Sequence, residues 1–131
     1  MLHYLTATKA FADPTRARIL AALLPGELCV CELCDALDVT QSTLSTHLQV
    51  LRKAGWVTTR KKGKWSYYAL DQPARRIGKL LFEAFADSIA ADRTLRADAR
   101  RRTHRLGLRE AGACCVGFSG CDQPKQKGAR S

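Results

Sequence analysis

Two short helical patterns separated by a three-residue polar corner restrict the fold of this chain more than any other feature. The first covers about residues 30–37, and after the corner, which ends at Thr40, the second covers residues 41–54. Thr40 is a suitable N-cap, and Gly55 is a suitable C-terminal stop. The second pattern has one apolar stripe with steps of four and three, made of Leu44, Leu48 and Leu51. Two short helices joined by a tight corner predict a helix-turn-helix.

The residues on either side of this unit predict how the fold continues. Residues 56–70 (WVTTRKKGKWSYYAL) place β-branched and aromatic residues around a Lys62-Gly63 turn, which indicates a hairpin, the wing. Upstream, Asp13 and Pro14 form the cap and first position of a helix that ends near Pro25-Gly26. We therefore predict a mainly α fold with a β-hairpin (α+β), a winged helix-turn-helix in the order α-α-α-α-β-β-α.

The C-terminal half predicts a dimer and an extension. A long helical stretch opens at Pro73, and its apolar face is too wide for one contact with a small body, so we expect a homodimer with residues 2–11 alongside. We expect residues 1–92 to form the winged helix-turn-helix and dimerisation domain. Residues 93–131 would be a basic, cysteine-containing extension, a helix end and then a mobile tail from about Gly112.

The charge and hydropathy exclude some classes of protein. The net charge is +10, and residues 93–131 hold 10 Lys and Arg against three acids. Residues 52–64 hold six Lys and Arg and no acid, which is a local basic patch on the folded body. No apolar run approaches the roughly 18 residues of a membrane span, and the N-terminus does not resemble a signal peptide. We expect a cytoplasmic protein without a membrane partner.

The second helical pattern and the hairpin together favour DNA as the partner. Hydroxyl and amide side chains near a helix N-terminus suit the major groove of double-stranded DNA, and cations suit its phosphates. Either feature alone is more often an ordinary solvated surface, but the order of corner, polar helix and basic hairpin reverses that preference. The candidate DNA-binding residues are Gln41, Ser42, Thr43, Ser45, Thr46, His47, Gln49, Arg52, Lys61, Lys62 and Lys64.

Three cysteines lie at the start of the first helical pattern, in ELCVCELCD. On a regular helix Cys31 and Cys34 are about 60 degrees apart, but Cys29 lies across the cylinder from Cys31. The three sulfurs therefore converge on one ion only if the segment around Cys29 is extended or the helix start unwinds. Three thiolates without a fourth partner suit three-coordinate arsenite or antimonite better than zinc.

Other uses of these cysteines are open. Free cysteine is commonly a buried small hydrophobe, and Cys31-Glu32-Leu33-Cys34 also has the CxxC spacing of thiol oxidoreductases, although no βαβ context accompanies it. If a metal binds, the ligands lie on the first helix of the helix-turn-helix. Distorting that helix should move the second helix of the unit, the recognition helix (residues 41–54), which packs against it. Metal occupancy would then be linked to DNA affinity.

The residues also resemble the ArsR/SmtB family of winged-helix metalloregulators. The resemblance covers roughly residues 5–90, through FADPTRARIL, ELCVCELCDAL, TQSTLSTHLQVLRKAGWV and RKKGKWSYYAL. CxCxxC resembles the arsenite and antimonite site of the family, which implies that Cys29, Cys31 and Cys34 are metal ligands. It also implies that As(III) or Sb(III) is the inducer, without an organic cofactor. Paired Asp and His ligands like those of the zinc sensors are not seen, because Asp87 has no neighbouring His.

The tail ACCVGFSGC resembles a C-terminal three-cysteine site of another branch of arsenic repressors. Its cysteines form a second site, a metal-scavenging tail or a surplus, and the sequence leaves these choices open. They are Cys114, Cys115 and Cys121.

The resulting hypothesis is a metal-responsive transcriptional repressor and not an enzyme. It would bind operator DNA as a dimer and be released by As(III) or Sb(III). The alternatives are a thiol redox-sensing DNA-binding regulator and, in a different class, a small thiol oxidoreductase or arsenate reductase.

Overall fold

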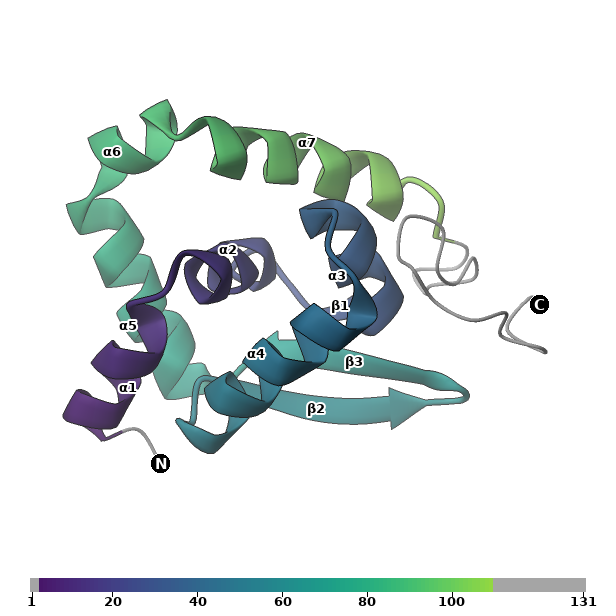
Figure 1. Cartoon of the computed structure of the whole chain (residues 1–131), viewed down its shortest axis with the longest axis horizontal. Helices are drawn as coiled ribbons and strands as arrows, with labels where there is room; N and C mark the ends of the chain where they lie inside the picture. The colour runs from purple at the N-terminus through teal and green to yellow at the C-terminus, as the bar shows by residue number, and fades with distance from the viewer. Residues whose placement is uncertain (1–2, 110–131) are drawn as a thin grey trace.

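The computed structural model describes residues 3–109, which form a winged helix (Figure 1). The helices are α1 (Tyr4–Phe11), α2 (Pro14–Leu23), α3 (Val30–Leu37), α4 (Gln41–Lys53), α5 (Gln72–Ala84), α6 (Ala86–Ala91) and α7 (Arg93–Leu106). The strands are β1 (Leu28–Cys29), β2 (Val57–Lys62) and β3 (Trp65–Leu70). The predicted fold class is confirmed, and the structure adds a short strand and two further helices. Within the described part of the chain, no helix is long and apolar enough to cross a membrane.

Local signals in the sequence set the ends of the helices. The Asp13 carboxylate accepts a hydrogen bond from Arg16 N at 3.0 Å, and the Thr40 hydroxyl accepts one from Thr43 N at 3.3 Å. Asp38 adopts a left-handed conformation (φ 56°) that turns the chain from α3 into α4. Gly55 has φ 88°, which favours glycine, and it ends the recognition helix as the sequence predicts.

The three strands form one antiparallel sheet in the order β1-β3-β2. Gly63, with φ 63°, lies in the turn between β2 and β3, so the hairpin that the sequence predicts is confirmed. The sequence did not predict β1, in which Cys29 pairs with Tyr67 of β3. This pairing attaches the segment that enters α3 directly to the wing.

The core lies between α2, α3, α4 and the base of the wing. All three leucines of the predicted α4 stripe, Leu44, Leu48 and Leu51, are buried. Trp56 is 1% exposed, and its indole N–H donates to the carbonyl oxygen of Ala7 at 2.9 Å. This buried hydrogen bond ties α1 to the end of the helix-turn-helix, because Trp56 directly precedes β2.

The long helical stretch that the sequence predicts after Pro73 is divided at Phe85. Phe85 has φ −110° and ψ 31°, which ends α5 and begins α6. No proline or glycine marks the break. It changes the direction of the chain, so that α7 returns over α3 (Figure 1). Tertiary packing of α7 therefore overrides the continuous helical pattern.

Buried ion pairs hold α7 to α2 and α3. Asp98 of α7 is 4% exposed and accepts hydrogen bonds from Arg18 of α2 at 2.8 and 2.9 Å and from Arg101 at 2.8 Å. Arg105 is 3% exposed and donates to the carboxylate of Asp35 of α3 at 2.6 Å. These pairs are charge-assisted, and Asp98 is satisfied by two guanidinium groups.

Other arginines of this region donate to carbonyls at the ends of the two inner helices. Arg102 Nε donates to the carbonyl of Ala22 at 2.7 Å, and Arg101 Nε donates to that of Ala36 at 2.9 Å. The last carbonyls of a helix lack partners within it, so these arginines satisfy groups that would otherwise need water. The helix α7 is thus joined to the body mainly by polar contacts.

Candidate functional site

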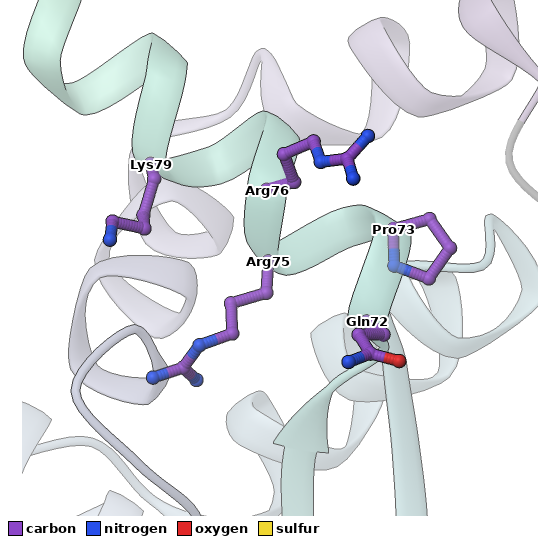
Figure 2. A pocket seen from close by; sticks show the side chains of 5 residues that line it. All are labelled: Gln72, Pro73, Arg75, Arg76 and Lys79. Atoms are coloured by element: carbon purple, nitrogen blue, oxygen red, sulfur yellow. The ribbon is translucent and has the colours of Figure 1, made fainter.

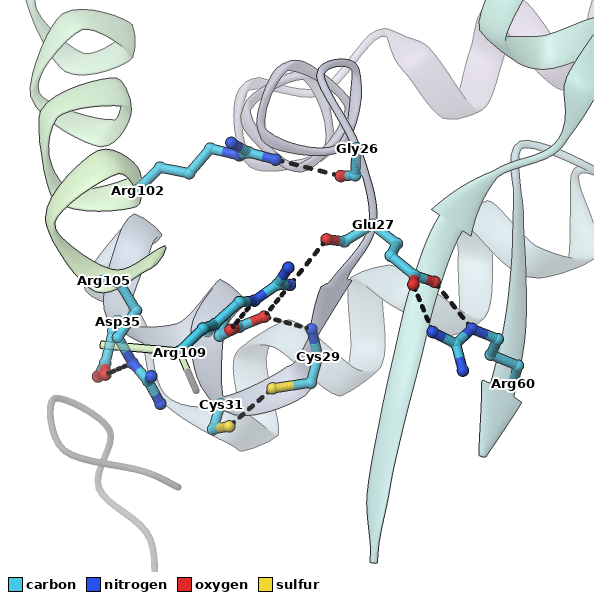
Figure 3. A network of polar contacts seen from close by, with 10 residues as sticks. Gly26, Glu27, Cys29, Cys31, Asp35, Arg60, Arg102, Arg105 and Arg109 are labelled. Atoms are coloured by element: carbon cyan, nitrogen blue, oxygen red, sulfur yellow. Dashed lines mark hydrogen bonds and ion pairs between the residues drawn. The ribbon is translucent and has the colours of Figure 1, made fainter. Parts of the chain in front are cut away.

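The sulfurs of Cys29 and Cys31 lie in contact at the junction of β1 and α3. The two Sγ atoms are 2.8 Å apart, and both residues are 1% exposed (Figure 3). Tyr67 packs against the pair, with Trp65 at the edge of this cluster. Cys29 has an extended backbone (φ −82°, ψ 168°), as the sequence requires if its sulfur is to meet that of Cys31.

A buried carboxylate fixes the backbone at Cys29. Glu32, 1% exposed, accepts the Cys29 backbone N–H at 3.0 Å through Oε1. The Cys29 side chain in turn accepts the backbone N–H of Glu32, which completes a capping box with cysteine in the place of serine or threonine. Both ends of Cys29, its amide and its sulfur, are therefore held at the first turn of α3.

Arg109, which follows α7, holds the carboxylate of Glu32 by two further hydrogen bonds. Its Nε and Nη2 donate to the two carboxylate oxygens of Glu32 at 2.7 and 2.8 Å, and Nη2 also donates to the carbonyl of Glu27 at 3.1 Å. The Glu32 carboxylate raises the pKa of Arg109 above its ordinary value. No sequence signal predicts this contact, because Arg109 is one of many arginines in the basic extension.

The third cysteine of the motif lies elsewhere. Cys34 is fully buried in the main hydrophobic core, apart from the cluster of Cys29, Cys31 and Tyr67. Among residues 3–109, no group of three His, Cys, Asp or Glu side chains stands ready to hold a metal ion. The role of the three cysteines as one ligand set thus stays a prediction. The second predicted set, Cys114, Cys115 and Cys121, lies outside the described residues.

An ion pair next to this site connects the start of β1 to the wing. Arg60 of β2 donates to both carboxylate oxygens of Glu27, from Nε at 3.0 Å, and its guanidinium lies 4.8 Å from the centre of the Tyr67 ring. The hydrogen bonds from Arg60 lower the pKa of Glu27. Arg60 is therefore engaged within the protein, whereas its neighbours Lys61 and Lys62 are exposed at the wing tip.

The recognition helix presents most of the predicted DNA-binding residues to solvent. Ser42, Thr43, Ser45, Thr46, Gln49 and Arg52 are exposed, and Gln41 is half-buried. His47 differs, because its Nδ1 lies 3.4 Å from Arg16 Nη1 and 3.9 Å from the Asp13 carboxylate, in contact with α2. On the wing, Lys64 is also exposed, with its Nζ 5.7 Å from the centre of the Trp65 ring. DNA contact by these residues stays a prediction.

The outer faces of α1 and α5 carry exposed apolar side chains and a basic hollow. Tyr4, Leu5, Leu80 and Phe85 are each more than half exposed. Figure 2 shows the hollow at the start of α5, lined by Gln72, Pro73, Arg75, Arg76 and Lys79. No sequence pattern predicted a role for these cations. A large exposed apolar surface on a small protein indicates a contact with another molecule.

The chain matches a family profile and several curated relatives. The profile "Bacterial regulatory protein, arsR family" matches residues 13–59. An uncharacterised HTH-type transcriptional regulator from Methanocaldococcus jannaschii is 48% identical over 77 residues, which cover 57% of this chain and 86% of the relative. The "Arsenical resistance operon repressor" of Escherichia coli is 51% identical over 63 residues, covering 47% of this chain and 54% of the repressor. The chain thus spans about half the length of that repressor.

Other matches include a relative named for cadmium resistance and two solved structures. A cadmium resistance transcriptional regulatory protein from Staphylococcus aureus is 40% identical over 78 residues, covering 59% of this chain and 63% of the relative. The structure of HlyU from Vibrio cholerae matches with a TM-score of 0.60 and 37% identity, covering 63% of this chain and 91% of HlyU. A homodimeric winged helix-turn-helix DNA-binding domain from Mycobacterium bovis matches with a TM-score of 0.62 and 26% identity, covering 69% and 84%.

Proposed function

The chain belongs to the arsR family of transcriptional repressors, and on that premise we propose a specific function for it. It is a homodimeric repressor that binds operator DNA when free of metal and leaves it when As(III) or Sb(III) binds Cys29, Cys31 and Cys34. The observation that carries the proposal is the contact of the Cys29 and Cys31 sulfurs, 2.8 Å apart, where β1 meets α3.

The DNA-binding part of the proposal rests on α4 and the wing. The exposed hydroxyl and amide groups near the start of α4 suit base edges and phosphates in a major groove. Lys61, Lys62 and Lys64 are exposed beside the hairpin turn and suit backbone phosphates. Two copies related by twofold symmetry would read half-sites about one helical turn apart.

The dimer in this proposal uses α1 and α5. These helices carry the exposed apolar residues Tyr4, Leu5 and Leu80, which a second copy would cover. The related Mycobacterium bovis domain is homodimeric, which supports the same assembly here.

The inducer part rests on the chemistry of the cysteines. Thiolates are the ligands that soft, thiophilic ions select, and Cys29 and Cys31 supply two sulfurs already in contact. Cys34 lies on the same helix but packs in the main core. The residues fit the ion by type, and Cys34 joins the pair only if the first turn of α3 changes. As(III) would supply strong bonds to sulfur that offset this rearrangement.

The position of the pair explains how its movement would reach both DNA-binding elements. Through α3, Cys31 is connected to α4, and through β1, Cys29 is paired with Tyr67 of the wing. A shift at the junction would therefore displace the recognition helix and the wing together. A change from 1:99 to 99:1 in the population of the two states requires about 5.5 kcal/mol of differential affinity.

The test is an As(III) titration of the reduced full chain on a labelled duplex selected from a random-sequence library. As(III) should weaken DNA binding by about 5- to 150-fold, the usual range of allosteric coupling. The C29S/C31S/C34S variant should bind the duplex and ignore As(III), whereas C114S/C115S/C121S, the matched control, should respond like the wild type. A response in the first variant equal to that of the wild type would exclude the proposed site.

The contact between the two sulfurs also favours a second candidate, a redox sensor with the same DNA-binding surface. A peroxide could oxidise the Cys29 and Cys31 thiols to a disulfide: it takes two electrons and two protons from them, and its O–O bond breaks to give two waters, or one alcohol and one water from an organic hydroperoxide. Release of DNA by peroxide without As(III), reversed by a dithiol, would favour this candidate over the metal sensor.

A further inference from the structure

The thiol pair of Cys29 and Cys31 is held by a chain of contacts that begins at Arg109, just after the end of α7. Glu32 is 1% exposed, and its carboxylate receives three hydrogen bonds, one from the Cys29 amide and two from Arg109. The two bonds from Arg109 form a fork that fixes both oxygens of the carboxylate. The backbone N–H of Glu32 also donates to the Cys29 sulfur. Glu32 therefore fixes the backbone of Cys29 through its carboxylate and the side chain of Cys29 through its amide.

We propose that Arg109 is a positioning residue for the thiol site: through Glu32 it holds the Cys29 sulfur against the Cys31 sulfur. The ligand is a thiophilic ion of the As(III) type, so this inference rests on the proposed function. Groups that orient metal ligands by hydrogen bonds raise metal affinity because they hold the ligands in place before the metal arrives. Here the ligands held in this way are Cys29 and Cys31, to which the ion would bind first, and Cys34 would join them in the later change of the α3 turn. Arg109 does this from 77 residues away in the sequence.

The contacts of Arg109 differ from those of the other arginines that hold α7. Arg102 donates hydrogen bonds to carbonyls at the end of α2 and just beyond it, those of Ala22 and Gly26, at 2.7 and 3.2 Å. Arg109 reaches Glu32 and the carbonyl of Glu27, the residue before β1. Arg102 therefore docks the helix, whereas Arg109 contacts both sides of the Cys29 junction (Figure 3). This difference supplies a matched control.

The experiment compares Arg109→Ala, Arg109→Lys and Arg102→Ala in the reduced full chain. Arsenite is titrated alone, and binding is followed by the absorbance of the sulfur-to-arsenic bonds. Arg109→Ala should bind As(III) about 10- to 100-fold more weakly, as is typical when a group that orients a metal ligand is removed. Lysine keeps the charge but cannot form both hydrogen bonds of the guanidinium fork, so the As(III) affinity of Arg109→Lys should lie between those of the wild type and Arg109→Ala. The As(III) affinity of Arg102→Ala should match that of the wild type.

A measurement without metal tests the positioning itself. Hydrogen exchange of the Cys29 amide should become faster in Arg109→Ala, because the Glu32 carboxylate that accepts this amide is released. Exchange of the Leu44 amide, which donates to the carbonyl of Thr40, should not change. Equal losses of As(III) affinity in the Arg109→Ala and Arg102→Ala variants would overturn the inference, since both would then act by loosening α7.

The outcomes separate this inference from the proposed function. If the C29S/C31S/C34S variant binds As(III) as the wild type does, the proposed site itself is wrong. If the wild type binds through the three cysteines and Arg109→Ala binds equally well, only the positioning role is wrong. Should Arg109→Ala fail to fold, Arg109→Lys decides the question, and wild-type affinity in that variant overturns the inference.

Discussion

Replacing Asp98 by alanine should destabilise the protein strongly, because this carboxylate joins α7 to α2. It is 4% exposed and accepts two hydrogen bonds from Arg18 and one from Arg101, at 2.8 to 2.9 Å. Removing one partner of a buried ion pair costs about 3 to 5 kcal/mol. Arg18 keeps its bond to the Leu37 carbonyl, and the Arg101 side chain is 41% exposed and regains water. We therefore expect the free energy of unfolding to fall by about 3 kcal/mol, the lower end of that range.

Urea unfolding followed by circular dichroism measures this loss. With an m-value of about 1.5 kcal/mol/M, the midpoint of the Asp98→Ala variant should fall by about 2 M. Protein concentration must be held constant because the stability of a dimer depends on it. Asp87→Ala, an exposed acid on α6, is the control and should change stability by less than about 0.5 kcal/mol.

A double-mutant cycle refines the test. Arg18→Ala combined with Asp98→Ala removes both charges, so the double variant should be more stable than the sum of the two single losses indicates. A loss below about 1 kcal/mol in Asp98→Ala, or strictly additive losses in the cycle, would refute the reasoning. In that case α7 would be held by something other than this ion network.

Two further predictions concern the wing. The double variant Lys62→Ala/Lys64→Ala should weaken DNA binding with little dependence on the DNA sequence. It should also reduce the slope of log K against log salt by about 0.9 per lost phosphate contact. An unchanged slope in a filter-binding titration would contradict this role. Glu27→Gln should destabilise the protein near neutral pH. Arg60 lowers the pKa of Glu27 from its ordinary 4.5. The ionised carboxylate therefore contributes stability above pH 4.5, and this stability is lost as the pH falls through the lowered pKa. The difference in unfolding free energy between the variant and the wild type should shrink as the pH falls below 4.5 and through the lowered pKa of Glu27. A difference that does not change with pH would argue against the ion pair as its cause.

The helix-turn-helix and the wing could be predicted because their signals are local. Thr40 caps the helix that follows it, and Gly55 adopts the positive φ that its position requires. The leucine stripe of α4 is buried because a step of four and three places it on one face. Each of these features depends on neighbours within a few residues, so a single sequence contains enough information to place them.

The docking of α7 could not be predicted, because its contacts join residues that are distant in the sequence. Its arginines lie in a strongly basic segment with few acids, a composition typical of a solvated tail. In the structure Arg105 is buried against Asp35, and Asp98 is buried between two guanidinium groups. A lone acid three residues before an arginine was the available signal, but the same spacing also occurs on exposed helices. The boundary at residue 92 therefore stays a prediction.

The spacing of the first three cysteines acquires a physical meaning from the junction in which it lies. Two cysteines at i and i+2 point to opposite sides of a helix, and a strand would bring them to the same side. Here Cys29 ends a strand and Cys31 lies in the first turn of a helix, so the change of backbone between them brings the sulfurs together. Cys34, one turn further, then follows the helical period and enters the core. A ligand that gathers all three must alter the strand-to-helix change itself, and that change is also where β1 holds the wing.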